Sequence, residues 1–217
     1  MKTFERWTID EVEEYFALQQ IFEHERLDTW LSAKEDFSTD EQKRLHELRR
    51  YAFENIEYWN EEDLKVKFLG AVLAYAAFDT PRYKGFLERS ISATFGNETL
   101  TGIVDFMVAT GKANPKQPFF FLQEFKPQKG AKRDPLAQVL TAMLVARELN
   151  STQRSQQEPL YGSYIIGRDW FFVMLLDKQY VVSRAFDSTQ NDIFRIVAIL
   201  RLLKQYIEQW LDAASNP

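Results

Sequence analysis

The chain of 217 residues contains no cysteine and only two histidines, His24 and His46. The absence of cysteine excludes disulfides, thiolate zinc sites and cysteine nucleophiles. Both histidines lie in the acidic N-terminal part, which disfavours serine-histidine triads, HExxH zinc sites and His-metal nucleases. No glycine-rich GxxxxGK or GxGxxG stretch occurs, so the sequence lacks the common nucleotide-binding loops. Any chemistry must therefore use carboxylates, lysine, glutamine and a hard metal ion.

Long apolar runs are also missing. No uninterrupted apolar run approaches the roughly 20 residues that span a bilayer, and the first residues are too charged for a signal peptide. We therefore expect a soluble, cytoplasmic protein with no membrane partner. Its apolar content of 45% and aromatic content of 15% suffice for one sizeable hydrophobic core.

Charge is unevenly distributed along the chain. The formal net charge is -5, yet residues 1–63 contain 8 Lys and Arg against 18 Asp and Glu. The remaining residues therefore contain 19 basic against 14 acidic side chains, a net charge of +5. A basic core behind an acidic N-terminal part is compatible with an anionic polymer as ligand.

The first third of the chain is predicted to be helical. Thr8 is followed three residues later by Glu11, a pattern typical of the capping box that begins a helix. Similar starts follow at Ser38 or Thr39 and at Asn60. We expect helices at residues 8–20, from 38 or 39 to about 56, and from 60 to about 76.

From residue 83 the apolar period changes to two, which is typical of strands. The Gly96-Asn97 pair separates two such stretches and predicts a hairpin. The run that starts at Pro118 is apolar on both faces, with Phe120 and Leu122 expected on one of them, and this favours a central strand. Asp134-Pro135 then begins a helix to about residue 149. Further strands are expected within residues 160–186, and a buried helix at 193–211.

This order of elements predicts an α/β fold. Residues 1–57 are expected to be an acidic helical segment packed on or capping the core, and residues 58–217 the core domain. Two interpretations of the N-terminal segment stay open. It can be a helical layer that completes the core, or an autoinhibitory or partner-binding element, through which the protein forms a homo-oligomer or binds another protein.

Three polar residues stand out in the predicted strands. Asp105 is flanked by apolar neighbours, and the strand that starts at Pro118 continues to Glu124 and Lys126 on one face. If the two strands pair antiparallel, Asp105 lies beside Glu124. Two converging carboxylates repel unless a cation lies between them, and Mg²⁺ suits carboxylate oxygens. A metal with an adjacent ammonium group is typical of phosphodiester hydrolysis.

An Asp in one strand and Glu-x-Lys in the next, after a helix with Glu and before a helix with Gln, resemble the PD-(D/E)xK nuclease superfamily. The resemblance covers roughly residues 58–185, with Val104 where the motif often has proline. It implies a restriction-endonuclease-like core, a central mixed β-sheet flanked by helices. It also implies Mg²⁺-dependent cleavage of nucleic acid, with DNA favoured over RNA and Mn²⁺ able to substitute.

The resemblance also implies roles for particular side chains. Asp105 and Glu124 would bind the metal, and Lys126 would assist the water. Glu61 or Glu62 would complete the metal shell, with Glu62 named as the third ligand, although helical periodicity does not choose between them. Both glutamates can instead simply favour the start of their helix. Catalytic orientation is assigned to Gln138 in the following helix, and phosphate contacts to Lys129, Lys132 and Arg133.

Other interpretations remain open, both for individual residues and for the function of the whole protein. The basic loop that contains Lys129 can be an ordinary solvated loop. The trio of Asp105, Glu124 and Lys126 can be a Glu-Lys ion pair with an unrelated Asp. For the whole protein, the alternative is a catalytically inactive nucleic-acid- or protein-binding module on the same fold.

Overall fold

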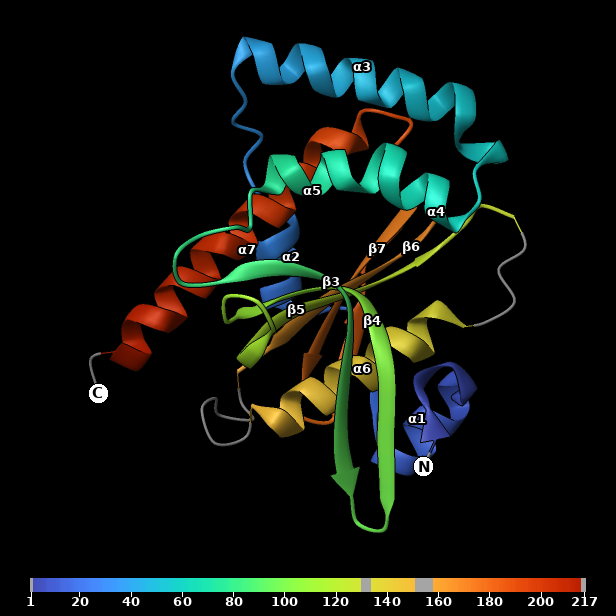
Figure 1. Cartoon of the computed structure of the whole chain (residues 1–217), viewed down its shortest axis with the longest axis vertical. Coiled ribbons are helices and arrows are strands. Elements are labelled where there is room, and N and C mark those ends of the chain that lie inside the picture. The colour runs from blue at the N-terminus through green and yellow to red at the C-terminus, as the bar shows by residue number, and fades with distance from the viewer. Residues whose placement is uncertain (1, 130–133, 151–157, 216–217) are drawn as a thin grey trace.

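The computed structural model describes residues 2–129, 134–150 and 158–215. These residues form an α/β fold in which nine strands make one mixed sheet with helices on both faces (Figure 1). The predicted α/β class is therefore confirmed. None of the helices in these ranges combines the length and the apolar character needed to cross a membrane.

Two helices of the N-terminal segment begin at the expected places. Capping boxes at Thr8 and Ser38 begin α1 (Ile9–Phe16), which ends before the expected residue 20, and α3 (Thr39–Asn55). A further helix, α2 (Glu25–Leu31), lies between them and was not predicted. The segment also supplies two short strands, which the sequence did not predict. β1 (Lys2–Thr3) pairs with β4 (Glu98–Thr110), and β2 (Gln19–Ile21) pairs with β8 (Gln179–Val182), each in parallel. The prediction of a purely helical segment was thus incomplete.

The helix expected from residue 60 is interrupted. A capping box at Asn60 begins α4 (Glu61–Leu64), and α5 (Gly70–Ala76) ends near the expected place. Between them, η3 (Lys65–Leu69) is a π-helical turn. π-helical turns widen a helix locally and occur frequently at functional sites.

The central strands follow the sequence prediction closely. β3 (Lys84–Phe95) and β4 form an antiparallel hairpin around Gly96, whose φ of 58° suits glycine. β5 (Lys116–Lys126) pairs antiparallel with β4, and α6 (Pro135–Leu149) leads to β6 (Leu160–Ile166), parallel to β5. β7 (Asp169–Leu176), β8, β9 (Phe186–Asp187) and α7 (Asp192–Ser215) complete the described chain.

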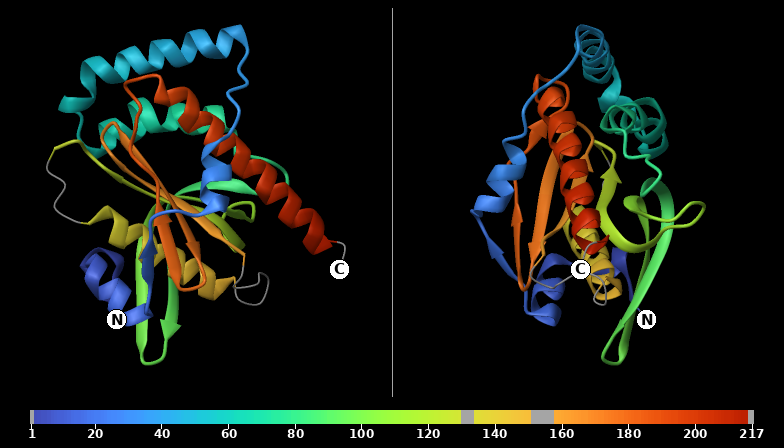
Figure 2. Two further views of the ribbon diagram at one scale, coloured as in Figure 1. Left: turned by 180° about the vertical axis from the view of Figure 1, so that it is seen from behind. Right: turned by 90° about the vertical axis from the view of Figure 1, so that its left-hand side faces the viewer.

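Both faces of the sheet are covered. α7, α5 and the N-terminal α2 and α3 lie on one side, whereas α6 and α1 lie on the other (Figures 1 and 2). Residues of the N-terminal segment are buried in the apolar clusters on both sides, with Trp30 and Leu45 in one and Val12 in the other. The segment therefore contributes to both halves of the core.

The two faces of β5 differ from the prediction at one point. Between Val108 and Ala109 the register with β5 shifts, so that Phe120 is an extra residue opposite β4. Phe120 consequently packs in the cluster on the α7 side, and Leu122 packs on the α6 side. The expectation that these two residues share a face was wrong because the bulge cannot be predicted from a period of two.

Candidate active site

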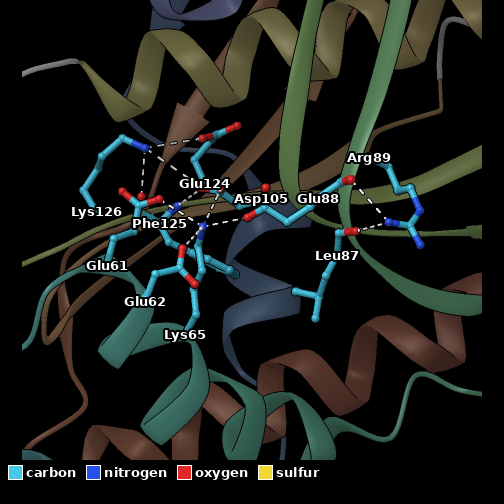
Figure 3. Close-up of polar contacts among 10 residues, drawn as sticks. All are labelled: Glu61, Glu62, Lys65, Leu87, Glu88, Arg89, Asp105, Glu124, Phe125 and Lys126. Atoms are coloured by element: carbon cyan, nitrogen blue, oxygen red, sulfur yellow. Dashed lines mark hydrogen bonds and ion pairs between the residues drawn. The ribbon is translucent and has the colours of Figure 1, made fainter.

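The structure brings Asp105 and Glu124 together on neighbouring strands. Phe106 pairs with Gln123, so the next position along the antiparallel pair sets Asp105 opposite Glu124. The two residues are 8% and 3% exposed. The backbone N–H of Phe125 donates to Oδ2 of Asp105 at 2.8 Å, which holds this carboxylate in place (Figure 3).

Glu124 is in an unfavourable position for a negative charge. Burial raises its pKa well above the usual range, and the negative charge of Asp105 and a hydrogen bond with it raise the pKa further. The Lys126 ammonium group acts in the opposite direction but does not cancel these effects. The Oε1 atom of Glu124 is buried without a hydrogen-bond partner in the described part of the chain. A buried carboxylate of this kind needs a proton or a cation.

Lys126 lies within reach of both carboxylates. Its Nζ atom is 3.7 Å from Oε2 of Glu124 and 4.0 Å from Oδ2 of Asp105. The same Nζ donates a hydrogen bond of 2.8 Å to the backbone carbonyl of Phe125. The three residues of the predicted motif thus form one cluster.

The start of α4 lies on the other side of Asp105. The capping box at Asn60 places Glu61 and Glu62 in the first turn of the helix. The Oε1 atom of Glu61 is 3.0 Å from Nζ of Lys65, and the same Nζ is 3.4 Å from Oδ1 of Asp105, so Glu61 lies beside the buried carboxylates. The side chain of Glu62 is 78% exposed and lies at the rim.

Two further residues belong to this cluster and were missed in the sequence. The Nζ atom of Lys65 is 2.7 Å from Oε1 of Glu88 on β3 and 3.4 Å from Oδ1 of Asp105. The same atom is 3.0 Å from Oε1 of Glu61 and 3.8 Å from Oε1 of Glu62 (Figure 3). The i,i+4 spacing of Glu61 and Lys65 in the sequence could have predicted their ion pair. The register of the β3–β4 hairpin, which sets Glu88 opposite Asp105, could have predicted that Glu88 lies near the site.

Of the other predicted residues, Gln138 lies on α6, Lys129 follows the end of β5, and two lie outside the described residues. Gln138 is buried on α6, and its Oε1 has no hydrogen-bond partner among the described residues. The side chain of Lys129 is 72% exposed, and its Nζ lies 3.6 Å from Oε2 of Glu57. The other carboxylate oxygen of Glu57, Oε1, lies 3.6 Å from the Arg168 guanidinium. Lys132 and Arg133 lie outside the described residues.

The carboxylates of this cluster are candidate ligands of a divalent cation. Within the described ranges, no group of three or more His, Cys, Asp or Glu is arranged to hold a metal ion. Mg²⁺, however, is often held by one or two carboxylates and several waters. Asp105 and Glu124 supply two such groups at neighbouring positions of β4 and β5, and Oε1 of Glu124 lacks a partner in this part of the chain. The two carboxylates therefore fit a magnesium ion.

Comparison with known proteins adds no assignment. No protein-family model matches the chain, and no curated protein matches it in sequence. The function is therefore inferred from the geometry and chemistry of the site.

Proposed function

We propose that the protein is a metal-dependent nuclease of the PD-(D/E)xK type, which hydrolyses phosphodiester bonds in DNA in preference to RNA. One observation carries this proposal. Asp105 and Glu124 are buried side by side on β4 and β5, and the ammonium group of Lys126 lies within 4.0 Å of both. The mixed sheet, with its parallel unit of β5, α6 and β6, supports a restriction-endonuclease-like core.

The side chains of the site would have different roles in the reaction. Asp105 and Glu124 would hold Mg²⁺, and the Phe125 N–H fixes the orientation of Asp105. The chemistry that the metal supplies when bound is a lower pKa for water and compensation of phosphate charge. Lys126, anchored by the Phe125 carbonyl, would orient the attacking water and donate to the phosphate oxygens as negative charge develops.

Basic side chains near the end of β5 would position the substrate. Lys126 pairs with Ile166, so the ends of β5 and β6 lie at the same edge of the sheet. Lys129 and Arg168 follow directly after these ends and are both at least partly exposed. Contacts from such residues to phosphates would align a strand without reading its bases. Lys132 and Arg133, for which the sequence also predicts phosphate contacts, lie outside the described residues.

A second candidate function is a catalytically inactive nucleic-acid- or protein-binding module on the same fold. The observation that favours it is Lys65, whose ammonium group already compensates Asp105 and the neighbouring glutamates. In this case the protein would bind nucleic acid without cleaving it.

The two candidates are separated by a cleavage assay with purified protein. Linear, branched and single-stranded DNA and RNA would be incubated with Mg²⁺, Mn²⁺ or EDTA. We expect cleavage with either metal, none in EDTA, and a loss of about 10²-fold or more in Asp105→Asn. Asparagine keeps an oxygen that can accept from the Phe125 N–H, so the variant tests the charge rather than the fold. Metal-independent binding without cleavage would instead establish the inactive module.

A further inference from the structure

Lys65 is the most heavily paired cation near the site. Its side chain is 12% exposed, and its Nζ lies within 4.0 Å of carboxylates from two helical and two strand residues. Its shortest contacts are 2.7 Å to Oε1 of Glu88 and 3.0 Å to Oε1 of Glu61, and these ion pairs hold the ammonium group in place.

Two backbone irregularities converge on this contact. Lys65 is the first residue of the π-helical turn η3. Its closest partner, Glu88, has a left-handed backbone with φ of 53° in the middle of β3. This conformation is unfavourable for a residue other than glycine, and such strain concentrates at functional sites. Both irregularities lie at the residues that make the 2.7 Å ion pair.

The position of Lys65 conflicts with metal binding. Its Nζ is 3.4 Å from Oδ1 of Asp105, while Oδ2 already accepts from the Phe125 N–H. An ammonium group cannot be a metal ligand, and it repels a divalent cation at this distance. Among the described residues, the buried Oε1 of Glu124 has no hydrogen-bond partner, and Glu124 lies opposite Asp105 on the neighbouring strand. This is independent evidence that the cluster is built for a ligand which Lys65 does not replace.

We propose that Lys65 is an internal competitor of the divalent cation. Without metal, its ammonium group compensates Asp105, Glu61 and Glu88. When metal binds, Lys65 leaves Asp105, and the oxygens of Glu61 and Glu88 become available as further ligands. Glu62, exposed and already 3.8 Å from Nζ, is the partner that retains the displaced ammonium group. This inference rests on the proposed function and adds a regulation of the same site by its own lysine.

The proposal is tested by metal binding in the absence of substrate. The full-length chain and its Lys65→Met variant would be titrated with Mn²⁺ by calorimetry. Removing a cation a few ångströms from the metal should tighten binding about tenfold or more. The control is Lys67→Met on the same turn, because Lys67 pairs with Asp63 at 2.6 Å and makes no contact with the cluster in the described structure. We expect its affinity to equal that of the parent. Unchanged or weaker binding by Lys65→Met would overturn the proposal.

A second measurement uses the unmodified protein and does not depend on whether Lys65→Met folds. Acetylation of lysines by acetic anhydride would be followed by mass spectrometry with and without Mg²⁺. We expect Mg²⁺ to accelerate the modification of Lys65 but not of Lys67. An unchanged rate at Lys65, in protein that binds Mg²⁺ by calorimetry, would refute displacement.

The outcomes also separate this inference from the nuclease proposal. If the parent binds metal and cleaves but Lys65→Met shows no gain in affinity, only the competitor role fails. If neither the parent nor Lys65→Met binds Mn²⁺ or cleaves, the proposed function fails and the competitor role fails with it.

Discussion

Lys65 and Lys126 approach different oxygens of the same carboxylate, yet their surroundings differ. Their side chains are almost equally exposed, at 12% and 13%. Lys65 has ion pairs as short as 2.7 Å and 3.0 Å, to Glu88 and Glu61. Lys126 lies no closer than 3.7 Å to a carboxylate and is held by a backbone carbonyl instead. The charge of Lys65 is thus compensated inside the protein, whereas we propose that the charge of Lys126 acts on a substrate.

The difference follows from the elements that carry the two residues. Lys126 ends β5, which is paired on both sides by β4 and β6, so its position is set by the sheet. Lys65 directly follows α4 and is the first residue of the π-helical turn η3. Equal exposure therefore does not imply an equal role. The number and distance of the carboxylates around each ammonium group are more informative.

The largest expected effect is on cleavage by Lys126→Ala. If Lys126 acts on the water and the phosphate, the rate of cleavage should fall by about 10²-fold or more without any loss of Mn²⁺ affinity. Cleavage rates and calorimetric titrations would be measured together. Lys67→Ala is the control, because Lys67 is an exposed lysine paired with Asp63. The cleavage rate of this variant should match that of the parent. A Lys126→Ala protein that is less stable but cleaves within a few-fold of the parent would make Lys126 a mere ion-pair partner of Glu124.

An intermediate effect is expected for Glu124→Gln. Glutamine keeps the shape but removes a buried charge, so the free energy of unfolding without metal should rise by about 1–2 kcal/mol. The variant should lose the stabilisation that Mg²⁺ gives the parent. Urea unfolding in EDTA and in Mg²⁺ would measure both changes.

Glu62→Gln is the matched control, since this side chain is 78% exposed and its change should be nearly neutral in EDTA. A Glu124→Gln protein that is less stable than the parent in EDTA would show that the contact with Lys126 outweighs the cost of burial. The charge of Lys126 would then be used internally, and the contrast with Lys65 would disappear.

The smallest effect is expected at Glu88, the closest partner of Lys65. Glu88→Gln removes the ion pair and should lower the free energy of unfolding by about 0.5–1 kcal/mol. Glu88→Gly also removes the ion pair, but glycine adopts the left-handed backbone conformation without steric cost. The free energy of unfolding should therefore be about 1 kcal/mol higher than that of Glu88→Gln. Thermal unfolding in EDTA would compare the two variants. If the glycine variant is no more stable than the glutamine variant, the bend at residue 88 carries no strain.

Much of the fold could be predicted because its signals are local. The capping residues Thr8, Ser38 and Asn60 begin helices where expected, and Asp134 caps α6. The turn at Gly96 also forms as predicted. The edge strands β1 and β2 were not predicted, because two or three residues are too few to show a period of two.

The sequence by itself determined that Asp105, Glu124 and Lys126 lie on consecutive strands, with Glu124 and Lys126 on one face, and the antiparallel pairing of β4 and β5 then brings them together. Only the tertiary structure decided that Lys65 lies beside Asp105, with Glu61 and Glu88 as its closest partners. The physical reason is that these contacts depend on how α4 packs against β3 and β4. That packing includes a π-helical turn and a left-handed residue, which local propensities do not predict.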